Sequence, residues 1–147
     1  MSNQFSQRFS DIISYSKEEA NRLCNNVVAP EHLLLGMLRD GEGKAIEVLQ
    51  KLNIDLQEIK TQVENAVKQS TLNFVSSNDN DIALSTSAAR ILKMCMLESR
   101  LLQSPLVDAE HLLLAILKDG DNDAAHILED HKAITFLREV IKEKVEE

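Results

Sequence analysis

The sequence is poor in the residues from which nucleotide and metal sites are usually built. Its 147 residues include four glycines, two prolines, two cysteines, one tyrosine and no tryptophan. With so few glycines it contains neither a GxxxxGK[ST] nor a GxGxxG pattern, so this chain by itself is not a nucleotide-binding domain. Cys24 and Cys95 lack CxxC spacing and have no further Cys or His at metal-ligand spacing. This favours buried or half-buried thiols in a reducing compartment.

Basic charge and long apolar runs are scarce too. The chain has 16 Lys or Arg against 24 Asp or Glu, a formal net charge of -8 that argues against binding to nucleic-acid phosphates. No window approaches about eighteen consecutive apolar residues, and the N-terminus lacks a basic start followed by an apolar run. We therefore expect no nucleic-acid or membrane partner, no export signal, and a cytoplasmic location.

What the sequence does contain is an internal repeat. The segment Glu31-His32-Leu33-Leu34-Leu35 recurs 79 residues later (110 minus 31) as Glu110-His111-Leu112-Leu113-Leu114. The same offset holds without a gap from Phe5 to Leu49, and with one residue removed it continues as 78 (134 minus 56) to Val67. Such a duplication predicts a repeat architecture. We place the first repeat at about 5–69, a polar linker at about 70–83 and the second repeat at about 84–147.

Each repeat is expected to form four helices, and the whole chain one all-α domain. Apolar residues recur three and four positions apart in the predicted helices. Ser6 and Ser85 suit the N-cap of the first helix, and Gly41 and Gly120 suit the left-handed turn that ends the second. The second helix begins at Ala29-Pro30 or Asp108-Ala109, the third spans about Lys44 to Leu52 or Asp123 to His131, and the fourth spans about Leu56 to Gln69 or Ile134 to Glu146.

One repeat is too small to form a robust core of its own. Domains below about 70 residues rarely gain more than a few kcal/mol from a single core. We therefore expect the two repeats to pack as one body with pseudo-twofold symmetry. The helices that carry Leu33-Leu34-Leu35 and Leu112-Leu113-Leu114 are apolar nearly all round, which predicts that they lie at its centre.

The repeated Glu-His pair is the most distinctive polar motif, and two interpretations stay open. In the first, Glu31 and Glu110 interact with the free N–H groups and the dipole of the first helical turn, while His32 and His111 are satisfied, partly buried packing residues. In the second, the two carboxylates accept a guanidinium or an amine. A metal or acid–base cluster of all four residues is disfavoured, because adjacent side chains on a helix diverge by about 100°.

Other polar residues give little support to catalysis. Cys24 and Cys95 fall at different repeat positions, and no base can be placed beside either thiol. His126 and His131 are expected at the surface. The acidic clusters are expected to be solvated loops and ends, with an adaptor-docking surface as the alternative. They consist of Asp79 and Asp81, of Asp119, Asp121 and Asp123, and of Glu143, Glu146 and Glu147.

From Phe5 onward, the chain resembles the double Clp-N motif, the N-terminal domain of Clp-type AAA+ unfoldases. The resemblance rests on the paired Val-x-x-Glu-His-Leu-Leu-Leu helices, the Asp-Gly turns and the repeat length, and EHLLLGMLRDGEGKA is most similar to the ClpC branch. It implies a non-catalytic, cofactor-free domain that recognises adaptor proteins and unfolded or tagged substrates. The parent unfoldase would feed a Clp protease, and its ATP and magnesium would bind ATPase modules absent from this chain.

The resemblance also implies a ligand. In some ClpC members this domain binds phosphorylated arginine, and motif position carries the guanidinium-accepting role to Glu31 and Glu110, with helix N-termini holding the phosphate. Family members with that site commonly have Gly-Thr just before each glutamate, where this chain has Ala29-Pro30 and Asp108-Ala109. Pro30 removes one N–H donor, and Asp108 adds negative charge beside a phosphate.

Three hypotheses follow from these observations. The first is a binding module for adaptors or exposed substrate segments, which the resemblance favours. The second is a structural cap or spacer of the parent hexamer that does not contact substrate. The third is a hydrolase that uses Glu31, His32, Glu110 and His111, and the adjacent spacing of each pair counts against it.

Overall fold

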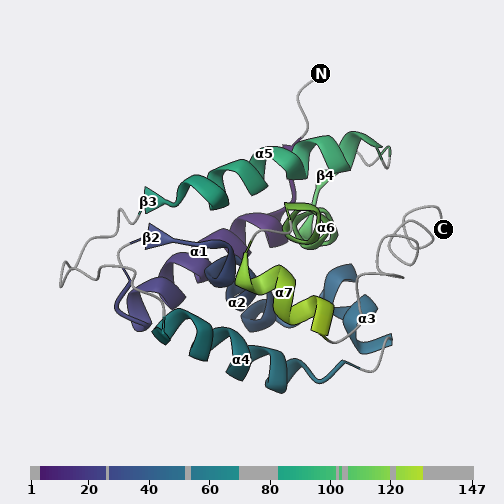
Figure 1. Cartoon of the computed structure of the whole chain (residues 1–147). Coiled ribbons are helices and arrows are strands. Elements are labelled where there is room, and N and C mark those ends of the chain that lie inside the picture. Colours follow the sequence, from purple (N-terminus) through teal and green to yellow (C-terminus); the bar gives the residue numbers. More distant parts are fainter. Residues whose placement is uncertain are drawn as a thin grey trace.

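Seven helices account for most of the residues that the structure describes. The structure is a computed structural model, and it describes residues 4–25, 27–51, 54–69, 83–101, 103, 106–119 and 122–130. The predicted helical fold class is confirmed (Figure 1). The helices are α1 (Gln7–Arg22), α2 (Pro30–Asp40), α3 (Lys44–Lys51), α4 (Leu56–Gln69), α5 (Thr86–Leu101), α6 (Ala109–Asp119) and α7 (Asp123–Asp130).

The helix bounds follow the predicted ones closely. In the first repeat α3 ends at Lys51, one residue earlier than predicted. Gly41 ends α2 with a φ of 71°, the left-handed turn expected of it. The fourth helix of the second repeat, predicted over 134–146, lies outside the described residues, as do Gly120, His131 and residues 70–82 of the linker. The repeat bounds at 5–69 and 84–147 stay a prediction.

Two pairs of two-residue strands join the repeats, a feature that the sequence does not predict. Strand β1 (Gln4–Phe5) pairs in parallel with β4 (Leu106–Val107). Strand β2 (Val27–Val28) pairs in parallel with β3 (Ala83–Leu84). Two residues are too few to show the alternation of apolar and polar side chains by which a strand is recognised. The loop expected between α1 and α2 therefore contains β2.

The strand pairing is reciprocal, which confirms the predicted pseudo-twofold symmetry. An offset of 79 residues maps β1 onto β3 and β2 onto β4, so each pair maps onto the other. Equivalent hydrogen bonds of 2.9 Å follow the two pairs, from the N–H of Ser6 to the carbonyl of Val107 and from the N–H of Ser85 to the carbonyl of Val28. Helix contacts are exchanged in the same way, because α2 contacts α7 and α6 contacts α3.

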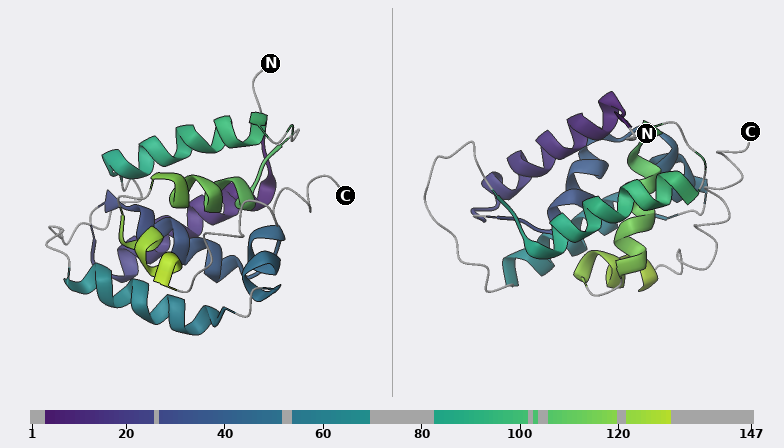
Figure 2. Two further views of the ribbon diagram at one scale, coloured as in Figure 1. Left: turned by 45° about the vertical axis from the view of Figure 1, so that its right-hand side comes forward. Right: turned by 90° about the horizontal axis from the view of Figure 1, so that it is seen from above.

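The leucine-rich helices α2 and α6 lie in the middle of the molecule. In Figure 1 and in the left view of Figure 2, α5 and α4 lie on opposite sides of them. The runs at 33–35 and 112–114 are buried as predicted. They join one continuous core, whose largest fully buried side chains are Ile12, Leu33, Leu34, Leu35, Met37, Ile46, Leu49, Ile59, Ile91, Leu112, Leu113 and Ile116.

Helices α1 and α2 approach each other closely at Gly36. A Cβ atom at this position would lie 2.4 Å from Oγ of Ser16, 2.6 Å from the carbonyl oxygen of Ile12 and 2.9 Å from the N of Ser16. Such distances are well inside van der Waals contact, so only glycine fits between the two helices as they stand. The equivalent residue of the second repeat is Ala115, which is fully buried.

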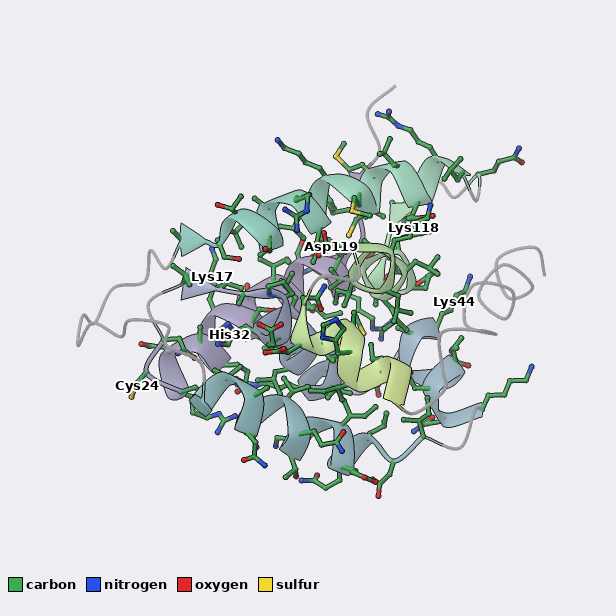
Figure 3. All side chains as sticks on the ribbon, in the orientation of Figure 1. Lys17, Cys24, His32, Lys44, Lys118 and Asp119 are labelled. Carbon is green, nitrogen blue, oxygen red and sulfur yellow. The ribbon has the colours of Figure 1, made fainter. Side chains whose placement is uncertain are left out.

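The last turns of α1 and α5 also correspond. Cys24 and Gln103 are 79 residues apart, and both have a left-handed φ, 62° and 54°. Cys24 is exposed and lies at the edge of the molecule (Figure 3), so the expectation of a buried or half-buried thiol is wrong for this residue, which follows the end of a helix. The expectation is confirmed for Cys95, whose thiol pKa is raised by burial.

Ser6 and Ser85 cap their helices as predicted. Oγ of Ser6 accepts a hydrogen bond of 3.0 Å from the N–H of Phe9, and Oγ of Ser85 accepts one of 3.0 Å from the N–H of Ala88. The Ser6 hydroxyl also donates to Oδ1 of Asp108, at 2.8 Å. The first cap therefore links the two repeats as well.

Replacing either capping serine by alanine is expected to lower the free energy of unfolding by about 1 kcal/mol. Ser6→Ala should have the larger effect, because it also removes the bond to Asp108. Urea denaturation measures both changes. Ser10→Ala, on the exposed face of α1, is the matched control and should change stability by no more than a few tenths of a kcal/mol. A Ser6→Ala protein as stable as this control would contradict the capping role.

Candidate functional site

The two Glu-His pairs occupy the same position in their helices. Glu31 is the second residue of α2 and Glu110 the second residue of α6, and each histidine follows in the first turn. In α2 the N-cap is Ala29, and Pro30 is the first helical residue, where its missing N–H costs no helical hydrogen bond.

The histidines tie the first turn of each helix to its N-cap. The N–H of Ala29 donates to Nδ1 of His32 at 2.8 Å, and the N–H of Asp108 donates to Nδ1 of His111 at 2.9 Å. Each imidazole therefore takes the part that a Glu or Gln side chain plays in a capping box. Because Nδ1 accepts, the proton of each neutral ring is on Nε2.

Both histidines are fully buried. Nε2 of His32 lies 2.8 Å from Oδ1 of Asn25 and donates to it. Burial lowers the pKa of His32 to about 4, and burial likewise lowers the pKa of His111. Nε2 of His111 has no hydrogen-bond partner among the described residues. The interpretation of His32 as a satisfied packing residue is confirmed, and its burial is complete rather than partial.

Glu31 reaches across to the other repeat. Its Oε2 accepts a hydrogen bond of 3.3 Å from the N–H of Ala124, in the first turn of α7. A carboxylate is favoured there by the free N–H groups and the helix dipole. Burial raises the pKa of Glu31, and the bond from Ala124 partly opposes that rise. Glu31 therefore interacts with the N-terminus of a second helix as well as lying in the first turn of its own.

Glu110 is in the equivalent place but is less well satisfied. The residue is 3% exposed, and its Oε1 has no hydrogen-bond partner among the described residues. Its Oε2 lies 4.0 Å from Nζ of Lys44, at the start of α3. Burial raises the pKa of Glu110, and Asp108 adds to the rise while Lys44 opposes it. Of the two carboxylates, Glu110 thus has the open acceptor.

The two positions that depart from the family pattern are both occupied. Pro30 lies in the first turn of α2, so one of the N–H groups that would face an anion is missing there. Oδ1 of Asp108 accepts a bond of 2.8 Å from the N–H of Ala109 and another from the hydroxyl of Ser6. A phosphate at the start of α6 would compete with that carboxylate.

No metal site is formed by the part of the chain that the structure describes. No group of three or more His, Cys, Asp or Glu side chains there is arranged to hold an ion. In the first repeat both nitrogens of His32 are engaged in hydrogen bonds. The Glu-His pairs act instead on helix ends, which is the first of the two interpretations drawn from the sequence.

The expectation of solvated acidic clusters is wrong for Asp119. Its side chain is only 5% exposed, and Oδ1 lies 2.7 Å from Nε of Arg90. The equivalent Asp40 is bound by Arg8, which lies on α1 at a position that does not correspond to Arg90. His126 and Asp123 are exposed as expected, and the clusters at Asp79 and Asp81 and at Glu143, Glu146 and Glu147 lie outside the described residues, as does Asp121.

A buried ion-pair cluster was missed in the sequence. Glu19 on α1 is bound by Arg22 and lies 3.5 Å from Arg39 of α2. Glu98 at the equivalent position is bound by Lys118, at 2.6 Å. The available signal was that a glutamate and a basic residue recur together at the same repeat positions.

Comparison with known proteins agrees with this architecture. The family model described as "Clp repeat (R) N-terminal domain" matches residues 4–131. A chloroplastic chaperone named ClpC2 from Arabidopsis thaliana is 34% identical over 130 residues, which is 88% of this chain and 13% of that protein. A chaperone named ClpB from Oceanobacillus iheyensis is 33% identical over 131 residues, 87% of this chain and 15% of that protein. The chain thus spans a small part of the length of these relatives.

A solved structure shows the same fold. The N-terminal domain of the Clp-protease-associated chaperone ClpD from Arabidopsis thaliana superposes with a TM-score of 0.76 at 20% sequence identity. The match covers 98% of this chain and 96% of that one. Among the described residues, no helix is long and apolar enough to cross a membrane.

Proposed function

Because the chain belongs to the Clp repeat N-terminal domain family of Clp/Hsp100 chaperones, we propose that it is the substrate- and adaptor-recognition domain of a ClpC-type ATP-dependent unfoldase. The observation that carries the proposal is the match over residues 4–131 to a domain that makes up 13% to 15% of much longer relatives. A domain of this kind contributes binding, and the ATPase modules of the parent protein contribute the work of unfolding.

The assignment to the ClpC branch rests on the segment EHLLLGMLRDGEGKA and on the relative named ClpC2. The partners are adaptor proteins and unfolded or tagged substrates, and the parent protein passes the substrates to a Clp protease. ATP and magnesium act in the parent protein alone. The cytoplasm is the proposed compartment, in keeping with two free cysteines.

A structural cap or spacer of the parent hexamer is the alternative. Deleting this domain from the full-length unfoldase separates the two functions. If the domain recognises substrates, the deletion abolishes the stimulation of ATP hydrolysis by adaptor-bound substrate and leaves basal hydrolysis in place. If it is a spacer, stimulation by substrate is unchanged.

Within the binding role, we propose Glu31 and Glu110 as acceptors for a guanidinium group, with phosphoarginine as the ligand to be tested. A carboxylate accepts the planar fork of a guanidinium in two parallel hydrogen bonds. Glu110 is the better acceptor, because Oε1 is unpartnered among the described residues, whereas Glu31 already accepts from Ala124. Pro30 and Asp108 weaken the phosphate half of such a site.

Titration calorimetry of this domain tests that ligand. The titrants are a phosphoarginine peptide and its unmodified arginine twin, and the proteins are wild type, Glu31→Ala, Glu110→Ala and the double variant. We expect selective binding of the phosphoarginine peptide, with a loss of about 10-fold in affinity for Glu110→Ala and a smaller loss for Glu31→Ala. No binding of either peptide by wild type would remove this site and leave adaptor docking elsewhere as the function.

A further inference from the structure

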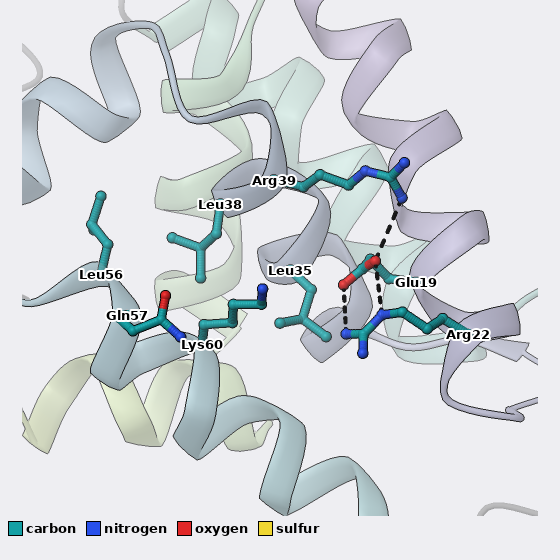
Figure 4. Close-up of a pocket in the computed structure, with 8 residues that line it drawn as sticks. All are labelled: Glu19, Arg22, Leu35, Leu38, Arg39, Leu56, Gln57 and Lys60. Atoms are coloured by element: carbon teal, nitrogen blue, oxygen red, sulfur yellow. Dashed lines mark hydrogen bonds and ion pairs between the residues drawn. The ribbon is translucent and has the colours of Figure 1, made fainter.

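A cavity of about 640 Å³ lies between α1, α2 and α4, in the first repeat (Figure 4). It is separate from the helix starts that carry the Glu-His pairs. Its volume is within the usual range for sites that bind small ligands or short peptide segments. The lining residues come from all three helices, and they are Glu19, Arg22, Leu35, Leu38, Arg39, Leu56, Gln57 and Lys60.

The one carboxylate in the lining is already neutralised. The side chain of Glu19 is 7% exposed and accepts bonds of 2.8 and 3.2 Å from Arg22, and Arg39 lies 3.5 Å away. Burial by itself would raise the pKa of Glu19, but the bonds from Arg22 and the charge of Arg39 outweigh burial and lower it. Both arginines are also bound at the rim, Arg22 by Glu64 and Arg39 by Glu18.

Lys60 differs from these arginines because its charge is not matched. No ion pair or hydrogen bond joins its side chain to the described residues, and it points into the middle of the cavity from α4 (Figure 4). Leu35, Leu38 and Leu56 form an apolar surface beside it. An ammonium group and an apolar surface therefore face the same space, next to a carboxylate that is already paired.

We propose that this cavity binds the C-terminal end of a partner protein whose last residue is apolar. The terminal carboxylate pairs with Lys60, and the last side chain packs on Leu35, Leu38 and Leu56. Backbone carboxylate capture of this kind is a recurring mode of peptide recognition. The inference rests on the proposed function, because it specifies which part of a bound protein the domain recognises.

A chain end fits the cavity better than an internal acidic residue. At a C-terminus the carboxylate and the apolar side chain are both attached to one Cα, so they enter the same space together. In an extended internal segment, successive side chains point to opposite faces, so an acidic residue and its apolar neighbour diverge.

The second repeat does not reproduce the basic wall of the cavity. The residue equivalent to Arg22 is Leu101, which is 67% exposed. The Glu98 and Lys118 pair preserves only the part that corresponds to Glu19 and Arg39. The proposed site therefore belongs to the first repeat.

The probe is the tripeptide acetyl-Ala-Leu-Leu with a free carboxylate, compared with its C-terminal amide, in ¹H–¹⁵N NMR titrations of the domain. We expect the free acid to shift the amide signals of Leu35, Leu38 and Lys60 saturably, and the amide to bind about 10-fold more weakly. Lys60→Gln should weaken binding of the acid by a similar factor, because the charge is lost while the fold keeps every described contact. Lys17→Gln, on the exposed face of α1, is the control and should bind as wild type does.

Equal binding of acid and amide, or the absence of saturable shifts at the cavity, overturns the proposal. A parallel titration with reduced, carboxymethylated α-lactalbumin, a permanently unfolded protein, distinguishes this failure from failure of the proposed function. If the unfolded protein binds while the tripeptides do not, the cavity proposal alone is wrong. If neither binds, substrate recognition by this domain is contradicted as well.

Discussion

Gly36→Ala is expected to lower the free energy of unfolding by about 2 kcal/mol or more, although alanine favours a helix over glycine by about 1 kcal/mol. The added methyl group would meet the backbone of Ile12 and the backbone and hydroxyl of Ser16 at 2.4 to 2.9 Å. Backbone atoms inside a packed helix pair cannot move aside locally, so α1 and α2 must separate. Guanidinium denaturation gives the change directly.

The second repeat provides the matched control for this substitution. Ala115 is equivalent to Gly36 and is fully buried between α5 and α6. Ala115→Gly removes one methyl group and adds backbone freedom, so a loss of about 1 to 2 kcal/mol is expected without a clash. A Gly36→Ala protein as stable as wild type would show that α1 and α2 are packed less tightly than the structure indicates.

Acidification is expected to destabilise the domain by about 3 kcal/mol through His32 alone. The pKa of this residue falls from 6.5 to about 4 on folding, and each pKa unit corresponds to 1.36 kcal/mol. In this interval the unfolded chain binds the proton and the folded protein does not, so stability is fully present above pH 6.5 and is lost as the pH falls towards 4. His111, whose pKa is also lowered, contributes in the same direction.

The carboxylates have effects that must be separated from that of His32. Burial raises the pKa values of Glu31 and Glu110, so protonation above 4.5 favours the folded state and opposes the histidine effect. Glu19, with its lowered pKa, loses stabilisation only below 4.5. Comparing the pH dependence of wild type with that of His32→Gln cancels the carboxylates.

Two measurements check the prediction for His32. Urea denaturation from pH 7 to pH 4 should show a smaller loss of stability in His32→Gln than in wild type, while His126→Gln, at an exposed position, keeps the wild-type slope. Histidine ring signals in NMR should show one residue that stays neutral until about pH 4. Titration of every histidine near 6.5 would contradict the buried, neutral capping role.

Local features of the fold were predictable because they depend on neighbouring residues. A serine before an apolar run indicates a cap, and Ser6 and Ser85 form those caps. A glycine after the last apolar residue indicates a helix end, and Gly41 is that end. The leucine runs predicted the central position of α2 and α6, since a helix that is apolar on all sides has to be covered on all sides.

Features that depend on distant residues were not predictable. Glu31 meets the N–H of Ala124, 93 residues further along the chain, and nothing near Glu31 in the sequence indicates this contact. Asp119 looks like a loop residue until Arg90 is placed beside it. Two-residue strands have no periodicity of their own and are stabilised only by a partner from the other repeat.

The reciprocal strands make each half of the molecule incomplete without the other. A shortened polypeptide with a single repeat would keep one strand of each pair and lose both partners, leaving unpaired backbone edges and one uncovered leucine helix. Two copies of that shortened polypeptide could supply what each lacks, in the manner of a domain-swapped dimer. The duplication thus joins covalently an arrangement that would otherwise depend on concentration, so the stability of the fused form no longer varies with the amount of protein.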